Sequence, residues 1–149
     1  MGRSGTARTL AGVTDAAPPA ETALDADLTL LGRPHHGPVE HVETFPAPAG
    51  CTKVVFTTDE VASLCPVTGQ PDISSVRIEY VPDQRCIESK SLKLYLWGFR
   101  DRHVFAEALA VEIADEVWNT VQPVSVDVVV TQHVRGGIVT ETHSSHPRA

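Results

Sequence analysis

One segment of this chain carries the residue types that covalent catalysis needs. Cys65 stands in residues 63–72, where two prolines and a glycine predict a loop because each interrupts regular structure. A thiol in a loop is more accessible than one in a strand, and its thiolate is the nucleophilic form. Asp72 closes the same loop and could move a proton beside the sulfur. The alternative interpretation is a buried structural cysteine with Asp72 capping a turn.

A second segment combines serine and lysine in a chain whose net charge is −7. It reads Glu-Ser-Lys-Ser-Leu-Lys at 88–93. Lys90 and Lys93 are three residues apart and would share a helix face, while Ser89 and Ser91 can bond anionic oxygens. This pattern favours a phosphate site. The alternative is an ordinary solvated helix start, with Glu88 favoured there by the helix dipole.

Glu107 is the third candidate, in a predicted helix but off its apolar stripe. A carboxylate in that position is usually solvated. If it faces a ligand instead, it could accept hydrogen bonds from ring N–H groups such as those of a purine.

Patterns for metals and nucleotides are absent from the sequence. No Cys-x-x-Cys, His-x₃-His or His-Glu-x-x-His pattern occurs, so no metal is expected. The pair His143 and His146 is interpreted as part of a polar, exposed tail. No Rossmann or P-loop pattern occurs either, so a dinucleotide would be held by other means.

The composition predicts one globular domain, since 149 residues with 42% hydrophobic side chains can bury a core. The acidic balance disfavours direct nucleic-acid binding. No apolar run is long enough for a membrane helix, and no secretory signal is evident. Three cysteines, Cys51, Cys65 and Cys86, disfavour a disulfide scaffold. We therefore expect a soluble cytoplasmic protein.

The elements that must position these residues follow from periodicity. Residues 1–35 are predicted to be a flexible tail and residues 36–149 a single domain. Strands are predicted at 53–56 and 75–81, helices at 88–99 and 103–120, and a hairpin from 124–130 and 138–140 around Arg135-Gly136-Gly137. The second helix has Phe105, Leu109, Ile113 and Val117 as its apolar stripe. The order ββααββ predicts an α+β fold with the helix pair on one face of an antiparallel sheet.

These segments resemble the NADPH-dependent 7-cyano-7-deazaguanine reductases, the QueF family, in its short single-domain type. The similarity rests on residues 64–72 and 88–95 and covers roughly residues 54–138, including Glu107 and the Arg-Gly-Gly turn. It implies a tunnelling fold, in which ββααββ subunits form an oligomeric barrel with sites between neighbouring subunits. It also implies reduction of a nitrile to an amine with NADPH, in the biosynthesis of queuosine in transfer RNA.

The resemblance implies a role for each matching residue. Cys65 would form a thioimide with the nitrile of 7-cyano-7-deazaguanine, and Asp72 would donate the proton. Substrate would be held by Ile87, Glu88, Ser89, Ala106 and Glu107, and NADPH by Ser89, Lys90, Ser91 and Lys93. A covalent intermediate would divide the reduction into two easier steps, as in other reactions with a nucleophilic catalyst.

One residue departs from the family pattern. Members usually have histidine immediately before the substrate-binding glutamate, where this chain has Ala106. His103 lies one helical turn earlier and could substitute in part. The departure favours one alternative, a deazapurine-binding protein without catalysis. Two relatives within the fold are further alternatives: an amidine-forming enzyme that uses no NADPH, against which the motif at 88–93 argues, and a zinc-dependent GTP cyclohydrolase, against which the absence of a Cys/His cluster argues.

Overall fold

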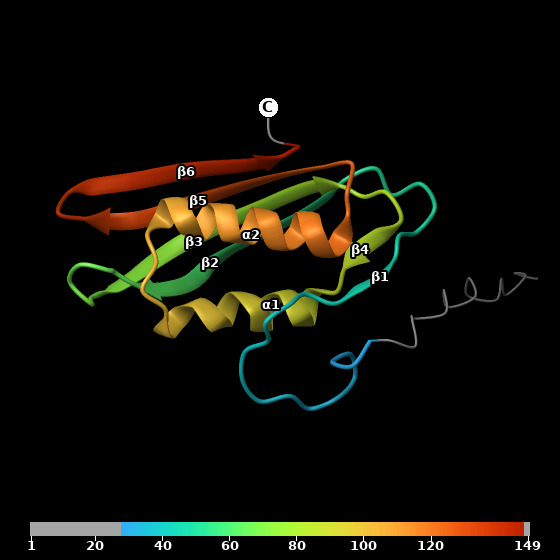
Figure 1. Cartoon of the computed structure of the whole chain (residues 1–149), viewed down its shortest axis with the longest axis horizontal. Helices are drawn as coiled ribbons and strands as arrows, with labels where there is room; N and C mark the ends of the chain where they lie inside the picture. Colours follow the sequence, from blue (N-terminus) through green and yellow to red (C-terminus); the bar gives the residue numbers. More distant parts are fainter. Residues whose placement is uncertain (1–27, 148–149) are drawn as a thin grey trace, which may run out of the picture.

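The computed structural model describes residues 28–147, and residues 1–27 of the predicted tail lie outside the described residues (Figure 1). Its elements are, in order, β1 (Thr44–Pro46), β2 (Val54–Leu64), β3 (Pro71–Val81), β4 (Arg85–Ile87), α1 (Ser89–Trp97), the 3₁₀ turn η1 (Gly98–Asp101), α2 (Ala106–Val121), β5 (Ser125–Arg135) and β6 (Ile138–His146). The predicted order is confirmed, with the short strands β1 and β4 added. No helix within residues 28–147 is long and apolar enough to cross a membrane.

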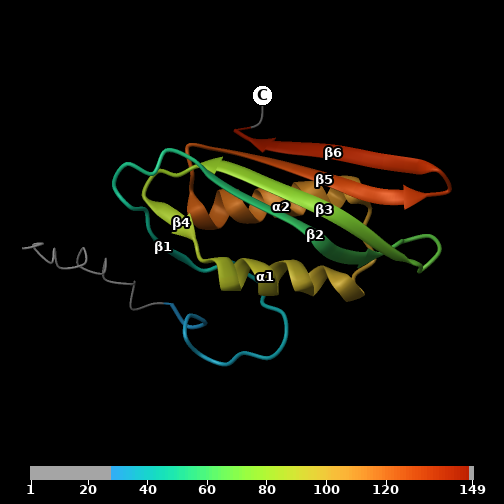
Figure 2. The same ribbon diagram turned by 180° about the vertical axis from the view of Figure 1, so that it is seen from behind.

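The main sheet is antiparallel, with strand order β2-β3-β5-β6, and β1 pairs separately with β4. Both helices cover the same face of this sheet, as the two opposite views show (Figures 1 and 2). The α+β prediction with a helix pair on one face is therefore confirmed. Alternate residues of β3 face the helices, and the buried set runs Asp72, Ser74, Val76, Ile78 and Tyr80.

Local chemistry explains where each helix begins and ends. The Glu88 carboxylate caps α1 by accepting hydrogen bonds from the N–H groups of Lys90 and Ser91, each at 2.8 Å. Helix α2 buries Leu109, Ile113 and Val117 against the sheet. It ends at Gln122, whose φ of 52° is left-handed and stops the helix.

The start of α2 corrects one prediction. The helix begins at Ala106 rather than at 103, because His103 forms a parallel bridge with Leu64 of β2. Phe105 precedes the first helical residue and is 54% exposed, so it does not belong to the buried stripe.

The C-terminal strand corrects a second prediction, the exposed tail at residues 143–146. His146 is not in an exposed tail: β6 extends through it, and its ring stacks on Trp118 and lies 2.6 Å from the carboxylate of Asp115. The long β5–β6 pairing carries this histidine back over α2, so its side chain is only 12% exposed.

The described residues before β1 are tied to the domain. Leu30 is buried, and the backbone N–H groups of Thr29 and Leu30 donate to the Glu43 carboxylate. These hydrogen bonds lower the pKa of Glu43, although its partial burial opposes them. Residues 29–33 thus lie against the start of α1.

Candidate active site

Three chain segments meet at one end of the sheet. The β2–β3 loop carries Cys65, the η1–α2 linker carries His103, and the β5–β6 turn carries Arg135. Backbone hydrogen bonds join the first two, since Leu64 N–H donates to Arg102 O at 2.9 Å and Val104 N–H donates to Leu64 O at 3.1 Å. The third segment joins them through its ion pair with Asp72.

The loop folds tightly around Cys65. The Cys65 N–H donates to Gln70 O, and the Gly69 N–H donates to Cys65 O, both at 2.9 Å. Gly69 has a φ of 69°, a left-handed conformation that glycine adopts without steric cost. This turn aims donors of Thr68 and Val67 at the sulfur.

The thiol of Cys65 is activated by those donors. Hydrogen bonds from the Thr68 hydroxyl, from the Thr68 and Val67 backbone N–H groups and from Arg135 lower the pKa of Cys65 from 9.0 to about 7, with desolvation opposing them. About half of this thiol is therefore thiolate at neutral pH. The residue is buried, with 7% of its surface exposed.

Asp72 lies beside this loop on the buried face of β3. It stands opposite Ser63 in the β2–β3 ladder and is 2% exposed. Its Oδ1 forms an ion pair with the Arg135 guanidinium. A carboxylate so deeply buried needs such a partner. The structure thus places Asp72 on the strand that directly follows the Cys65 loop, where it pairs with Arg135.

Arg135 is a site residue that the sequence analysis did not select. It ends β5 immediately before Gly136 and Gly137, whose φ values of 58° and 83° form the tight turn. Ser74 pairs with Gln132, so continuing the same register places the end of β5 beside Asp72. The Arg-Gly-Gly turn was a usable signal, but the partner of the arginine could not be read from it.

His103 contacts the same loop. Its Nδ1 lies 3.3 Å from the carbonyl oxygen of Cys65, and the ring is exposed. Ala106 is buried at the start of α2, and its carbonyl oxygen accepts a hydrogen bond from Thr142 Oγ1 at 3.1 Å. Ala106 offers no polar side chain. Glu107, the next residue, is exposed in the first turn of α2.

In the Glu-Ser-Lys-Ser-Leu-Lys motif, some side chains are hydrogen-bonded within the fold and others are exposed to a ligand. Ser91 is fully buried, and its hydroxyl donates to Glu88 O at 2.7 Å and accepts from Glu43 N–H at 2.8 Å. Lys90 Nζ donates to the carbonyl oxygens of Leu30, at 2.7 Å, and of Arg33. With Glu88 capping the helix, only Ser89 and Lys93 remain exposed.

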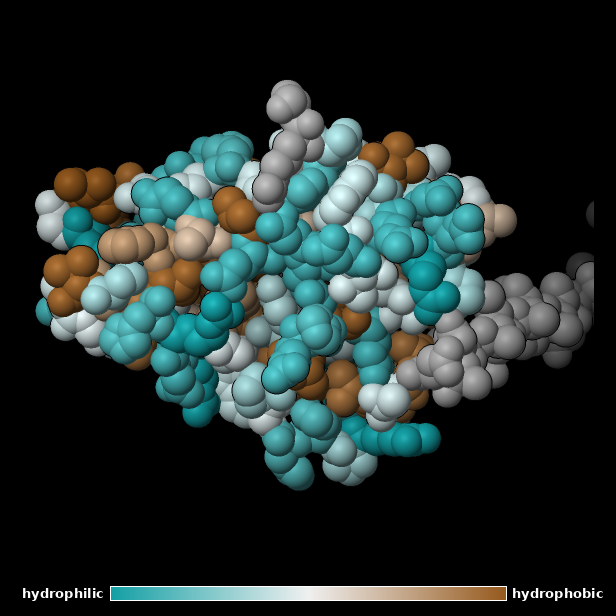
Figure 3. All heavy atoms as spheres, in the orientation of Figure 1, coloured by the Kyte–Doolittle hydropathy of each residue, from teal (hydrophilic) through white to brown (hydrophobic). Residues whose placement is uncertain are grey.

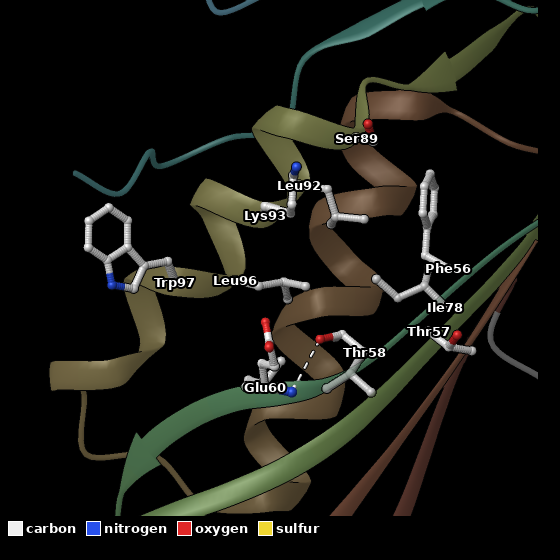
Figure 4. A pocket seen from close by; sticks show the side chains of 12 residues that line it. Phe56, Thr57, Thr58, Glu60, Ile78, Ser89, Leu92, Lys93, Leu96 and Trp97 are labelled. Atoms are coloured by element: carbon white, nitrogen blue, oxygen red, sulfur yellow. Dashed lines mark hydrogen bonds between the residues drawn. The ribbon is translucent and has the colours of Figure 1, made fainter. Parts of the chain in front are cut away.

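Ser89 and Lys93 line a groove of about 500 Å³ between α1 and the strands β2 and β3. Figure 4 shows them on the helix side, with Phe56 and Ile78 facing them from the strands. A cation and a hydroxyl beside an apolar wall suit a ligand with a phosphate and a flat ring. Ser89 and Lys93 are therefore available to a ligand in this groove, whereas Ser91 is inaccessible.

The Ser89 end of the groove lies far from the thiol within one subunit, whereas the other end of the groove reaches Val61, three residues before Leu64. Phe56 lines the Ser89 end, and Leu64, which precedes Cys65, is eight residues farther along β2. At about 3.3 Å per residue this separation is roughly 25 Å. Ile87 lies at the groove end too, buried, with its N–H bonded to the Tyr80 hydroxyl.

Hydrophobic side chains surround the thiol end. Val67, Val134, Ile138 and Val139 are all exposed there, at the tips of the β2–β3 loop and the β5–β6 turn. Figure 3 shows hydrophobic surface gathered at this end of the molecule. Among residues 28–147, no group of three or more histidine, cysteine or acidic residues could hold a metal ion.

Comparison with known proteins gives consistent matches. The family model described as "QueF-like protein" matches residues 71–149. A protein of Alkalilimnicola ehrlichii named NADPH-dependent 7-cyano-7-deazaguanine reductase is 43% identical, over 73% of this chain and 86% of its own length. One of Anaeromyxobacter sp. with the same name is 43% identical, over 74% of this chain and 94% of its own. A crystal structure of the archaeosine synthase QueF-Like in the apo form matches with a TM-score of 0.62 and 26% identity, covering 66% of this chain and 96% of that chain.

Proposed function

The chain belongs to the QueF family, and we propose that Cys65 and Asp72 carry out the reaction for which its relatives are named. That reaction is the NADPH-dependent reduction of 7-cyano-7-deazaguanine, so the protein is an oxidoreductase acting on a nitrile. The observation that carries the residue assignment is the Cys65 loop, whose hydrogen bonds lower the pKa of the thiol to about 7, with the buried carboxylate of Asp72 on the strand that follows it.

The first step forms a covalent bond between Cys65 and the substrate. The thiolate adds to the nitrile carbon, and one carbon–nitrogen bond pair moves onto nitrogen. The proton lost from the thiol passes to Asp72 and from there to that nitrogen, which gives a neutral thioimide. This step replaces a nitrile, a poor hydride acceptor, with a more reactive carbon–nitrogen double bond.

The reduction then proceeds around the same sulfur. NADPH, when bound, supplies the two hydrides that a four-electron reduction requires. After the first hydride and one proton have been added across the carbon–nitrogen double bond, the nitrogen gives up a proton, the carbon–sulfur bond breaks and Cys65 leaves as the thiol. The resulting imine accepts the second hydride and a proton to give the primary amine.

The remaining predicted residues would bind substrate and cofactor. Glu107 would accept hydrogen bonds from the ring N–H groups of the deazaguanine, since its carboxylate is free in the first turn of α2. Ser89 and Lys93 would hold NADPH in the α1 groove. Ile87, Glu88 and Ser91 would shape this site from beneath, because their side chains are buried.

The separation of the Cys65 end from the Ser89 end of the groove favours active sites that lie between subunits. The Ser89 end of the groove is roughly 25 Å from the thiol on one chain, and the two would come together if the groove of one copy lay against the thiol end of another. The edge strands β2 and β6 and the exposed apolar side chains around Cys65 support such an assembly. A homo-oligomeric barrel is thus part of the proposal.

The test is NADPH oxidation by the purified full chain with 7-cyano-7-deazaguanine. The parent should consume two NADPH for each nitrile and Cys65→Ala none. Cys51→Ala is the matched control, since Cys51 lies in the loop before β2, away from the Cys65 site, and should keep parental activity. Turnover that survives Cys65→Ala would remove this residue from the mechanism.

An amidine-forming activity is the second candidate. It is favoured by the similarity to the archaeosine synthase structure and by Ala106 at the position where reductases usually have histidine. Ammonia-dependent consumption of the nitrile without NADPH oxidation would identify it. Binding of 7-cyano-7-deazaguanine without any turnover would instead indicate a deazapurine-binding protein.

The proposed cellular role is a step toward queuosine in transfer RNA, with free deazapurine rather than nucleic acid as the ligand. The net charge of −7 supports this, because a phosphate backbone would be repelled. A cytoplasmic location is part of the same proposal, since NADPH and the transfer RNA pool are found there.

A further inference from the structure

We propose that Ser74 is a positioning residue whose hydroxyl relays protons from the groove beside α1 to the carboxylate of Asp72. The inference deepens the proposed function and rests on it, because it names the route by which the buried proton donor is supplied during each turnover. Ser74 lies two residues after Asp72 on β3 and is neither a substrate nor a cofactor residue of the proposed mechanism.

The proposed reaction consumes protons that must come from solvent. Reduction of a nitrile to a primary amine adds two hydrides and two protons, and the thiol proton returns to Cys65 when the carbon–sulfur bond breaks. Asp72 is only 2% exposed, so its carboxylate has little direct contact with water. The guanidinium of Arg135, its ion-pair partner, stays protonated and therefore cannot pass a proton on. The donor thus needs a neighbouring group that connects it to solvent.

Ser74 carries a buried hydroxyl without a protein partner. The residue is 1% exposed, and its Oγ forms no hydrogen bond with any residue between 28 and 147. Burying an unpaired hydroxyl destabilises a fold relative to an apolar side chain of the same size, so alanine would suit this position better for packing alone. The hydroxyl therefore indicates a functional role in contact with a small polar molecule such as water.

Ser74 lies between the groove and the proton donor. Asp72, Ser74 and Val76 are successive buried positions on the helix-facing side of β3, roughly 7 Å from one to the next. Val76 lines the groove, and so does Val61, which stands opposite Ser74 in the β2–β3 ladder. The Ser74 hydroxyl therefore has the inner end of the groove on one side and Asp72 on the other, at a spacing that one water molecule can bridge.

A β-bulge in β2 produces this arrangement. The register of β2 against β3 shifts between Thr58 and Val61, where two residues of β2 oppose one of β3. Within the bulge the Glu60 N–H donates to the Thr58 hydroxyl at 3.2 Å (Figure 4). After the bulge the buried positions of β2 change phase, which turns Val61 inward against Ser74. The exposed Glu60 lines the groove, so a group that exchanges protons with solvent lies near its inner end.

A hydroxyl suits such a relay because it both donates and accepts hydrogen bonds. A proton that enters the groove from the buffer is accepted by the Ser74 oxygen, while Ser74 gives up its own proton through one bridging water to Asp72. The hydroxyl ends unchanged, and the carboxyl group is neutral and ready to protonate the substrate nitrogen. Ser74 thus acts through Asp72 and does not touch the reacting carbon.

The experiment compares the parent, Ser74→Ala and Ser75→Ala, each as the full chain. Ser75 is the matched control, because it is the next residue of β3, faces the other side of the sheet and has its hydroxyl 3.0 Å from His133 Nε2. Three quantities are measured: the rate of adduct formation with 7-cyano-7-deazaguanine at pH 6 without NADPH, the rate of NADPH oxidation in water and in heavy water, and the melting temperature.

We expect Ser74→Ala to separate the two rates. At pH 6 most of Cys65 carries its own proton, since its pKa is about 7, so adduct formation needs no relay and should stay parental. NADPH oxidation should fall roughly 10-fold, with a larger solvent isotope effect than in the parent, because each turnover draws two protons through the relay. The melting temperature should be unchanged or higher, since the variant removes an unpaired buried hydroxyl. Ser75→Ala should match the parent in both rates and in the isotope effect.

Parental NADPH oxidation and a parental isotope effect in Ser74→Ala would overturn the relay and leave the proposed function intact. A Ser74→Ala variant that fails to fold, or that loses adduct formation and turnover equally with a lower melting temperature, would show a structural role and would also overturn the relay. A parent that forms no adduct and oxidises no NADPH would overturn the proposed function, and the relay with it.

Discussion

His103 lies beside Leu64 in a parallel bridge, and its Nδ1 stands 3.3 Å from the carbonyl oxygen of Cys65. The imidazole is thereby attached to the backbone of the nucleophile, in a chain whose α2 helix begins with Ala106. The contact makes His103 the one imidazole that the described structure places at the Cys65 loop.

The first prediction concerns this contact. His103→Ala should lower kcat/KM by about fivefold, because a hydrogen bond that orders the loop contributes about 1 kcal/mol. Steady-state NADPH oxidation measures it, and His103→Asn, which keeps a donor, should recover part of the loss. Parental rates in His103→Ala would show that the position is dispensable.

A second prediction concerns pH. With a Cys65 pKa of about 7, the thiolate fraction rises as the pH rises, so the rate of adduct formation with 7-cyano-7-deazaguanine should climb between pH 6 and 8 and level off above. This rate is measured without NADPH, by quenching samples at successive times and determining the adduct by intact mass spectrometry. Thr68→Val removes the hydroxyl donor and should shift the climb to higher pH. A profile that is flat across this range would contradict the assignment.

Asp72→Asn should slow adduct formation and turnover by about 10²- to 10⁴-fold, since it removes the group that relays the proton. The amide also leaves Arg135 without its ion pair. NADPH binding, measured by fluorescence titration, should not change, because Ser89 and Lys93, and not Asp72, line the groove proposed for the cofactor. An equal loss of cofactor binding would indicate general unfolding instead.

The two serines of α1 offer a matched comparison. Ser91→Ala should lower the melting temperature by a few degrees, because it removes the hydrogen bonds that hold β1 and the helix start together. Ser89→Ala and Lys93→Ala should leave the melting temperature unchanged and raise the KM for NADPH. Calorimetry and initial rates separate the two effects, and a KM effect of Ser91→Ala alone would reverse the assignment.

Glu107→Gln should raise the KM for the nitrile by roughly 10- to 100-fold while changing kcat little. The substitution removes a charge-assisted hydrogen bond to the base, about 1.5–3 kcal/mol. Glu112, an exposed acidic residue of the same helix that pairs with Arg102, provides the control as Glu112→Gln. Equal effects of the two changes would remove Glu107 from the substrate site.

The positions of the main strands and helices followed from the sequence alone, because burial of one face imposes a regular spacing of hydrophobic residues. The alternation in residues 75–81 places every second side chain of β3 against the helices. The spacing of Leu109, Ile113 and Val117 gives α2 its buried face. Prolines and glycines located the Cys65 loop, and the motifs within it indicated the family.

Contacts between distant segments could not be derived in this way. The Leu64–His103 bridge delays the start of α2 and leaves Phe105 exposed. The pairing of β5 with β6 extends to His146 and brings it over α2. In each case a hydrogen-bonded partner remote in sequence overrides the local pattern.

The division between sequence and tertiary structure is clearest at the site itself. Residue types and the family resemblance predicted Cys65 as a nucleophile and Asp72 as a proton donor, because chemistry depends on functional groups that are read directly from a sequence. Only the fold pairs Arg135 with Asp72, since these two residues, 63 positions apart in the sequence, are brought together by the antiparallel pairing of β3 with β5. Orientation on a helix likewise decided that Ser91 is buried while Ser89 is free, and orientation depends on what packs against each face.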